Sequence, residues 1–126
     1  ILRDILATPV SPELLPANGG EISQKTEELV GSYELHDLFL YYFLKGKGPK
    51  ELYDIALGTL DFGEEEVYKT LGTFLRRFFS QQFKRNCAPE APLVCLSIAP
   101  SVWNMPSDMA SAAFMAEYER IKRRQS

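Results

Sequence analysis

The sequence predicts a mostly α-helical chain, and three observations indicate this class. Apolar residues recur at helical spacing in three ranges, 33–45, 49–58 and 61–85. Glycines that end helices stand between these ranges. The chain has 126 residues, 45% hydrophobic and 25% charged, which suits a globular unit with one core. Its longest apolar run, Leu38 to Leu44, is far short of the roughly 20 residues that cross a bilayer, which excludes a transmembrane segment.

Residues 7–31 are predicted to form a loop that covers a ligand. The stretch is rich in proline and glycine and poor in apolar residues. A loop of about 25 residues is unusual inside a compact domain unless it is a linker or closes over a site. Hydrogen-bonding and charged side chains from Ser23 to Glu28 favour the second role. Ile1 to Leu6 reads like the end of a helix already under way, so we expect an internal fragment of a longer protein.

The first helix is predicted from Tyr33 to Lys45. Ser32 is the expected N-cap, Glu34 adds negative charge to the first turn, and Gly46 and Gly48 end the helix. One face is apolar and is expected to be core. Its residues are Leu35, Leu38, Phe39, Tyr42 and Phe43.

The second helix is predicted from Pro49 to about Gly58. Proline suits the first helical position, where a backbone N–H has no partner to lose. Glu51, Tyr53 and Asp54 are expected on its solvated side.

The third helix is predicted from Asp61 to about Arg85. Asp61 is the expected N-cap, with Glu64 three residues on. The expected buried stripe consists of Val67, Leu71, Phe74, Leu75 and Phe78. A second, polar stripe consists of Arg77, Ser80, Gln81 and Lys84. Such a stripe suits an anionic ligand lying along the helix, and a plain solvated face is the alternative.

The remaining residues are predicted to form a proline-rich loop over 87–106 and a terminal helix over 107–124. Residues 93–98 are a candidate short extended segment within the loop. The helix is expected to begin at Ser107 or Asp108, and the cations at 122–124 complement its C-terminal end.

Charge is distributed unevenly and favours a small anionic ligand. Residues 1–70 carry 6 Lys and Arg against 13 Asp and Glu, whereas residues 71–126 carry 8 against 4. With a pI of about 5.2 the chain lacks the general basicity of a nonspecific nucleic-acid binder. Basic and aromatic residues alternate over 76–79 and 83–85 as in RNA-binding proteins, but the phenylalanines fit the core better.

Common catalytic and metal-binding patterns are missing. His36 is the single histidine, and Cys87 and Cys95 are the only cysteines, so the sequence predicts neither a zinc site nor a Ser/His/Asp or Cys/His catalytic arrangement. We expect both thiols to be reduced and buried, as in a cytoplasmic protein. No glycine-rich phosphate loop occurs. The pair Glu27 and Glu28 is a candidate Mg²⁺ or acid–base group, and a surface carboxylate pair is the alternative.

Four segments, in order, resemble the C-terminal end of bacterial glutamine-dependent NAD⁺ synthetase. They are Thr8–Leu14, Gln24–Asp37 with its Val-Gly-Ser-Tyr-Glu-Leu-His-Asp run, Arg76–Arg85 with Phe-Lys-Arg at its end, and Met105–Asp108. The resemblance implies a fold: the helical C-terminal portion of a Rossmann-like, adenine nucleotide alpha hydrolase-like domain whose parallel sheet lies upstream. Residues 1–126 would then be one C-terminal fragment with 32–86 as its helical core.

The resemblance also implies an activity. The family uses ATP to adenylate the nicotinate carboxylate of deamido-NAD⁺, and ammonia made from glutamine then displaces AMP to give NAD⁺. ATP and Mg²⁺ would serve the full enzyme, and the partners would be deamido-NAD⁺, ATP, the glutaminase domain of the same full-length chain and further copies of it. Neither nucleic acid nor membrane is implied, and the location is cytoplasmic. The fragment alone is expected to be inactive, because the family's pyrophosphate loop and glutaminase domain are absent from these residues.

Site residues follow from the motifs one by one. Lys84 matches the lysine that lies against the nicotinate carboxylate, and Arg77 on the polar stripe is assigned to the same substrate. Ser11, Glu13 and Glu28 match the loop that approaches the ATP phosphates, with Glu27 in the same acidic stretch. Tyr33 and Asp37 fall in the family's helix-start motif. No catalytic residue is assigned, and the metal ligands stay open.

One segment departs from the family pattern. This chain reads Ala91-Pro92-Leu93-Val94 and then Ala99 to Asn104, without the aspartate and cations that the family places around the nicotinate ring. Two alternatives therefore stay open: a noncatalytic helical interaction module derived from the synthetase fold, and a small RNA-binding helical domain.

Overall fold

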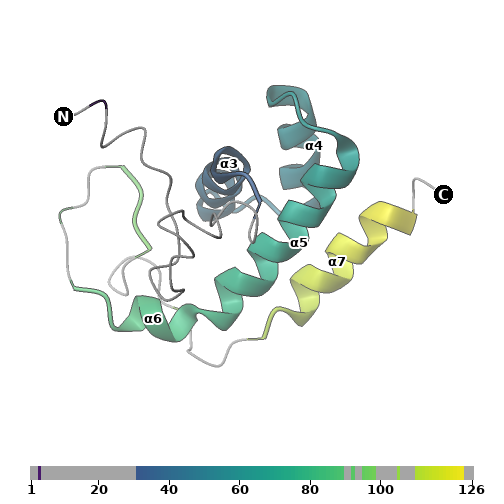
Figure 1. Cartoon of the computed structure of the whole chain (residues 1–126). Coiled ribbons are helices and arrows are strands. Elements are labelled where there is room, and N and C mark those ends of the chain that lie inside the picture. The colour runs from purple at the N-terminus through teal and green to yellow at the C-terminus, as the bar shows by residue number, and fades with distance from the viewer. Residues whose placement is uncertain are drawn as a thin grey trace, which may run out of the picture.

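The computed structural model describes residues 3, 31–89, 92, 95–98, 105 and 110–123. This part of the chain is all helical, with no strand. Its helices are α3 (Tyr33–Leu44), α4 (Pro49–Thr59), α5 (Glu64–Ser80), α6 (Gln82–Asn86) and α7 (Ala112–Arg123). The long helix α5 is central and contacts the other four (Figure 1). Of the loop predicted over 7–31, residues 7–30 lie outside the described residues.

Helix α3 forms as its sequence predicts. The Ser32 hydroxyl accepts the backbone N–H of Glu34 at 3.2 Å, which confirms the N-cap. Gly46 follows the helix with φ +84°, a conformation that glycine adopts without strain. Leu35, Phe39 and Phe43 are buried, and Leu38 and Tyr42 are half-buried against the same core.

Helix α4 confirms the predicted start and two predicted exposed residues, and it corrects the predicted exposure of a third. Pro49 is its first residue, and the Glu51 carboxylate accepts the backbone N–H of Gly48 at 3.1 Å. Glu51 and Asp54 are exposed as expected. The prediction for Tyr53 is wrong, because this side chain is 3% exposed. Its apolar ring packs edge-on against Tyr68 of α5, with 6.5 Å between ring centroids.

Helix α5 begins later and ends earlier than predicted. The N-cap is Gly63, not Asp61, and three glutamates in the first turn supply the negative charge that the positive end of the helix dipole favours. The predicted buried stripe, from Val67 to Phe78, is confirmed. A continuous helix to Arg85 is wrong: α5 stops at Ser80, Gln81 has φ −100° and ψ 12°, and α6 starts afresh.

The core contains an aromatic cluster centred on Phe43. Its ring lies 4.9 Å from Phe78 and 5.5 Å from Phe114, both with edge-on geometry. These contacts join α3, α5 and α7, and edge-on ring pairs add stability beyond the apolar area that they bury.

Helix α7 begins at Ala112, so a start at Ser107 or Asp108 is wrong. Ala110 and Ser111 are not helical, and the Ser111 carbonyl accepts the N–H of Met115 at 2.9 Å. Within the described residues, none of the helices is both long enough and apolar enough to cross a membrane.

The two cysteines are free, as predicted, but both are exposed rather than buried. Cys87 follows α6, and Cys95 lies in the segment after it, where residues 95–98 form no strand. Neither thiol belongs to the buried core, which the four longer helices and Met105 form within the described residues.

Candidate ligand pocket

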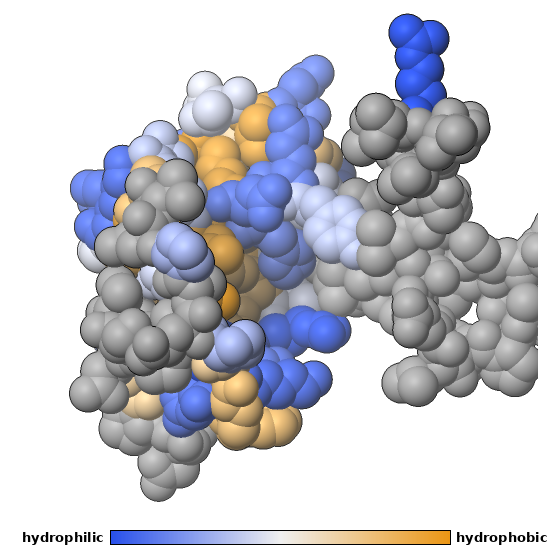
Figure 2. Space-filling model, turned by 90° about the vertical axis from the view of Figure 1, so that its left-hand side faces the viewer, coloured by the Kyte–Doolittle hydropathy of each residue, from blue (hydrophilic) through white to orange (hydrophobic). Residues whose placement is uncertain are grey.

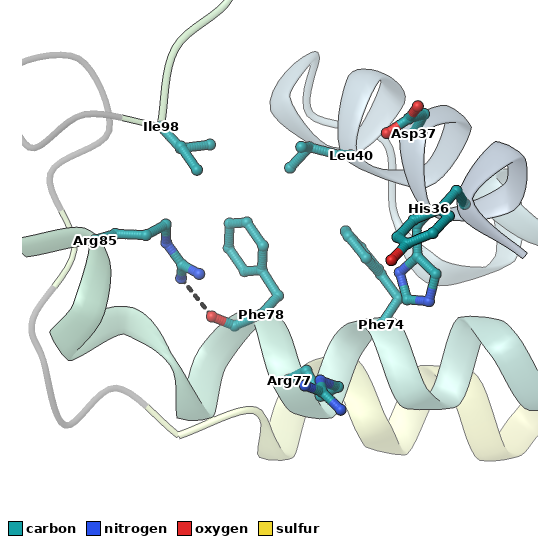
Figure 3. A pocket seen from close by; sticks show the side chains of 9 residues that line it. His36, Asp37, Leu40, Phe74, Arg77, Phe78, Arg85 and Ile98 are labelled. Atoms are coloured by element: carbon teal, nitrogen blue, oxygen red, sulfur yellow. Dashed lines mark hydrogen bonds between the residues drawn. The ribbon is translucent and has the colours of Figure 1, made fainter. Parts of the chain in front are cut away.

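A pocket of about 380 Å³ lies between α3 and the α5–α6 junction. Nine described residues line it: Tyr33, His36, Asp37, Leu40, Phe74, Arg77, Phe78, Arg85 and Ile98. Phe74 and Phe78 project from α5 towards Leu40 of α3 and Ile98 (Figure 3). The interior is therefore aromatic and aliphatic, with charged groups set around it.

The aromatic wall is held by the helical core. The Phe74 ring meets His36 edge-on, with 6.0 Å between centroids, and lies 5.7 Å from Phe78. Each of the two phenylalanines is 6% exposed. An apolar wall with a few fixed polar groups is typical of sites for small organic ligands.

Arg85 supplies a cation at one end of this wall. The centre of its guanidinium lies 4.0 Å from the Phe78 ring centroid, and Nη2 donates to the Phe78 carbonyl. Carbonyls in the last turn of a helix lack an intrahelical N–H, so the arginine completes the end of α5. Burial lowers the pKa of the guanidinium, which still stays protonated at neutral pH because its ordinary value is so high.

Gln82 fixes the other side of the guanidinium. This side chain is 1% exposed, and its Oε1 accepts Arg85 Nε at 3.1 Å. Its Nε2 donates to Asn86 Oδ1 at 2.8 Å and to the Met105 carbonyl at 3.3 Å. Both ends of the buried amide are thus paired, as a polar group without access to water requires.

The predicted site residues do not all meet here. Arg77 is exposed and lines the pocket together with Tyr33 and Asp37. Lys84 is exposed on α6, with Nζ 5.9 Å from the Phe83 ring centroid, and is not part of the described lining. The break at Gln81 changes the direction of the backbone between Arg77 and Lys84, so the polar stripe is not one line along one helix. Ser11, Glu13, Glu27 and Glu28 lie outside the described residues.

Sequence reasoning missed Arg85 and Gln82. Arg85 does not fall on the polar stripe of a straight helix. Of the two neighbouring amides, the stripe included the more exposed Gln81 and not Gln82. The signal was the spacing of Gln82 and Asn86, four residues apart, in a segment otherwise read as polar surface. The interpretation of the phenylalanines as core is confirmed for Phe78 and Phe79, which are buried, and is wrong for Phe83, which is 52% exposed.

A second pocket, of about 520 Å³, lies between α5 and α7. Tyr68 and Tyr118 stack there at 4.2 Å with an interplanar angle of 16°. Burial, followed by hydrogen bonding to Tyr68, raises the pKa of the Tyr118 phenol above its usual range, so it is neutral at all ordinary pH values. Glutamates 64 and 65 and lysines 69 and 122 complete its described lining.

The surface on the side of the first pocket is mixed rather than uniformly charged. Figure 2 shows the left-hand face of Figure 1, where apolar surface lies open between hydrophilic side chains.

Within the residues that the structure describes, no group of three or more His, Cys, Asp or Glu side chains gathers in a way that could hold a metal ion.

Comparison with known proteins confirms the resemblance predicted from the four motifs: the chain is homologous to a portion of glutamine-dependent NAD⁺ synthetase. It is 31% identical to the glutamine-dependent NAD(+) synthetase of Mycobacterium leprae over 143 aligned positions, which cover 95% of this chain and 21% of that protein. The proteins of the same name from Mycobacterium bovis and Mycobacterium tuberculosis are 29% identical, and the alignments again cover 95% of this chain and 21% of the relative. The chain spans about a fifth of the length of these curated relatives. No family model matches it, and no solved structure does.

Proposed function

We propose that this chain is the C-terminal part of the synthetase domain of a glutamine-dependent NAD⁺ synthetase, an ATP-dependent amide ligase. One observation carries the proposal: homology that extends over 95% of the chain. The apolar pocket with arginines beside it supports a role in binding a ring-bearing, anionic substrate. The Rossmann-like parallel sheet that the proposal requires would lie upstream, and the enzyme would be a cytoplasmic homo-oligomer.

The reaction explains why cations are needed in this part of the enzyme. A carboxylate resists attack by ammonia because it carries negative charge and has no leaving group. Its oxygen therefore first attacks the α-phosphorus of ATP and releases pyrophosphate, and ammonia then attacks the acyl carbon and releases AMP. Both substrates, deamido-NAD⁺ and ATP, bring several negative charges into one site.

The residues of this chain would bind and orient rather than react. Lys84 would pair with the nicotinate carboxylate and so favour the acid substrate over the neutral amide product. Arg77, at the pocket, would stand beside the pyrophosphate bridge of the same substrate. Ser11, Glu13 and Glu28 would approach the ATP phosphates. We assign no ligands to Mg²⁺, because no suitable cluster lies within the described part of the chain.

A graft into a relative tests this function. The matched portion of the Mycobacterium leprae synthetase is replaced by this chain, and the control is the same enzyme with that portion deleted. NAD⁺ formation is measured with deamido-NAD⁺, ATP, Mg²⁺ and ammonium. Glutamine hydrolysis, which the family places in a separate domain, reports that this other domain is intact, and circular dichroism reports whether the grafted portion is helical. The 126-residue chain alone should make no NAD⁺.

The expected result is NAD⁺ formation by the graft clearly above that of the deletion control. A graft that hydrolyses glutamine but makes no more NAD⁺ than the control would contradict the proposal. That outcome would favour a noncatalytic helical module, in keeping with the altered sequence between residues 91 and 104.

A further inference from the structure

We infer that Gln82 is a positioning residue that holds the Arg85 guanidinium against the pocket wall, ready to pair with an anionic oxygen of the ligand. The inference rests on the proposed function for the identity of the ligand, and on the described contacts for everything else. It adds a third binding cation to Lys84 and Arg77, which are already assigned to this substrate.

The Arg85 side chain is held in place before any ligand binds. Its Nε and Nη2 both donate to Gln82 Oε1, and Nη2 also reaches the Phe78 carbonyl. The ring of Phe78 covers one face of the guanidinium at 4.0 Å. A guanidinium fixed by two hydrogen-bond acceptors and a ring loses little further rotamer freedom on binding.

One nitrogen of the Arg85 guanidinium is not used by the described bonds and is left for the ligand. Arginine has five N–H donors in one plane, and the described bonds use Nε and Nη2. Nη1 carries two more N–H groups. Arg85 lines the pocket, and Figure 3 shows the guanidinium between Phe78 and the α6 backbone, across the pocket from Asp37. The negative group therefore stands at the opposite side from the cation.

The Gln82 side chain is itself held by a contact from outside α6. Its Nε2 donates to the Met105 carbonyl, a residue 23 positions along the chain. Met105 is 7% exposed and belongs to the core. The orientation of Arg85 is thus tied to packing at Met105, not only to the short helix that carries it.

The side-chain signal of Arg85 tests the positioning without reference to the reaction. In the nuclear magnetic resonance spectrum of the 126-residue chain, the Arg85 Nε–H should give a resolved, slowly exchanging signal. Gln82→Met should remove that signal, because methionine fills similar space without an acceptor. Gln82→Glu should retain part of it, since a carboxylate accepts from the same donors but cannot donate to the Met105 carbonyl. Gln81→Met, the same chemical change one residue earlier, should leave it in place.

Affinity measurements on the graft described above then test the consequence. Arg85→Met should weaken deamido-NAD⁺ binding by about 10 to 150-fold, the loss of one charge-assisted contact. Gln82→Met should weaken it by about 2 to 12-fold, since the guanidinium must then be ordered on binding. Gln82→Glu should also weaken it, because the new carboxylate pairs with the cation while holding it in position.

Parallel titrations with NAD⁺ identify which anion Arg85 meets. NAD⁺ has the same diphosphate but an amide in place of the carboxylate. Equal losses for both ligands in Arg85→Met assign the diphosphate, and a loss for deamido-NAD⁺ alone assigns the carboxylate. Unchanged affinity for both ligands, or an Arg85 signal that survives in Gln82→Met, would overturn the inference. A graft without synthetase activity refutes the proposed function instead and leaves the signal test standing.

Discussion

The hydroxyl oxygen of Tyr118 on α7 lies 2.5 Å from the place where a β-carbon on Gly72 of α5 would stand. Gly72 is buried, and the ring carbon that bears the hydroxyl is only 2.7 Å from the same place. Helices α5 and α7 can pack this closely only because residue 72 has no side chain. The terminal helix is therefore fitted to the central helix through one glycine and one tyrosine.

Replacement of Gly72 by alanine should destabilise the chain. The added methyl group would overlap the Tyr118 phenol, and overpacking of this kind costs about 1–3 kcal/mol. The gain of about 1 kcal/mol that alanine brings to a helix offsets only part of it. Urea unfolding followed by circular dichroism measures the difference.

Gly58→Ala is the matched control for this change. Gly58 lies in α4 with nothing within 4 Å of its would-be β-carbon. This variant should be more stable than the parent by about 0.5–1 kcal/mol. If both variants gain stability, the close packing of Tyr118 on Gly72 is not a constraint on the fold.

Glu117→Met should weaken the contact between α7 and α4. The half-buried Glu117 carboxylate accepts the backbone N–H of Lys50 at 3.3 Å, in the first turn of α4. Methionine keeps the stem but removes both the acceptor and the negative charge at the helix N-terminus, so the free energy of unfolding should fall by about 0.5–2 kcal/mol. Glu119→Met, an exposed change on the same helix, should alter it much less. Equal effects would mean that the capping contact contributes nothing.

Glu51 should give the chain an acid-sensitive contribution to stability. The hydrogen bond from Lys47, at 2.8 Å, and then the one from the Gly48 backbone lower the pKa of this carboxyl below its ordinary 4.5. Because the folded pKa lies below the unfolded one, the contribution is fully present above about pH 4.5 and is lost as the pH falls through the folded pKa.

The test compares the parent chain with Glu51→Gln at two pH values. At pH 7 the parent should have the higher urea midpoint, and the difference should shrink towards zero at pH 3. High salt should also reduce it, since both partners are exposed. A difference that persists at pH 3 would show that the Glu51 charge is not the cause.

The sequence predicted those parts of the fold that depend on local patterns. The apolar spacing from Leu35 to Phe43 and from Val67 to Phe78 predicted two core helices correctly, because burial on one face imposes that spacing. Ser32 and Pro49 marked helix starts by local chemistry alone.

The break between α5 and α6 could not be predicted in this way. No glycine or proline stands between Phe74 and Asn86. The bend at Gln81 depends instead on tertiary contacts: Arg85 reaches back to the Phe78 carbonyl, and Gln82 reaches out to Met105. The candidate pocket follows from this bend, and for that reason the sequence indicated Arg77 but overlooked Arg85 as part of its lining.

The affinity of the graft for its two nucleotides tests most directly the claim that this chain holds the acid substrate. Lys84→Met keeps the aliphatic stem but removes the ammonium, so deamido-NAD⁺ affinity should fall by about 10 to 150-fold, the loss of one charge-assisted contact. NAD⁺ and ATP affinities should change little, because neither ligand carries the nicotinate carboxylate. Deamido-NAD⁺ affinity that is the same with lysine or methionine at position 84 would contradict the claim and leave the noncatalytic module as the better account.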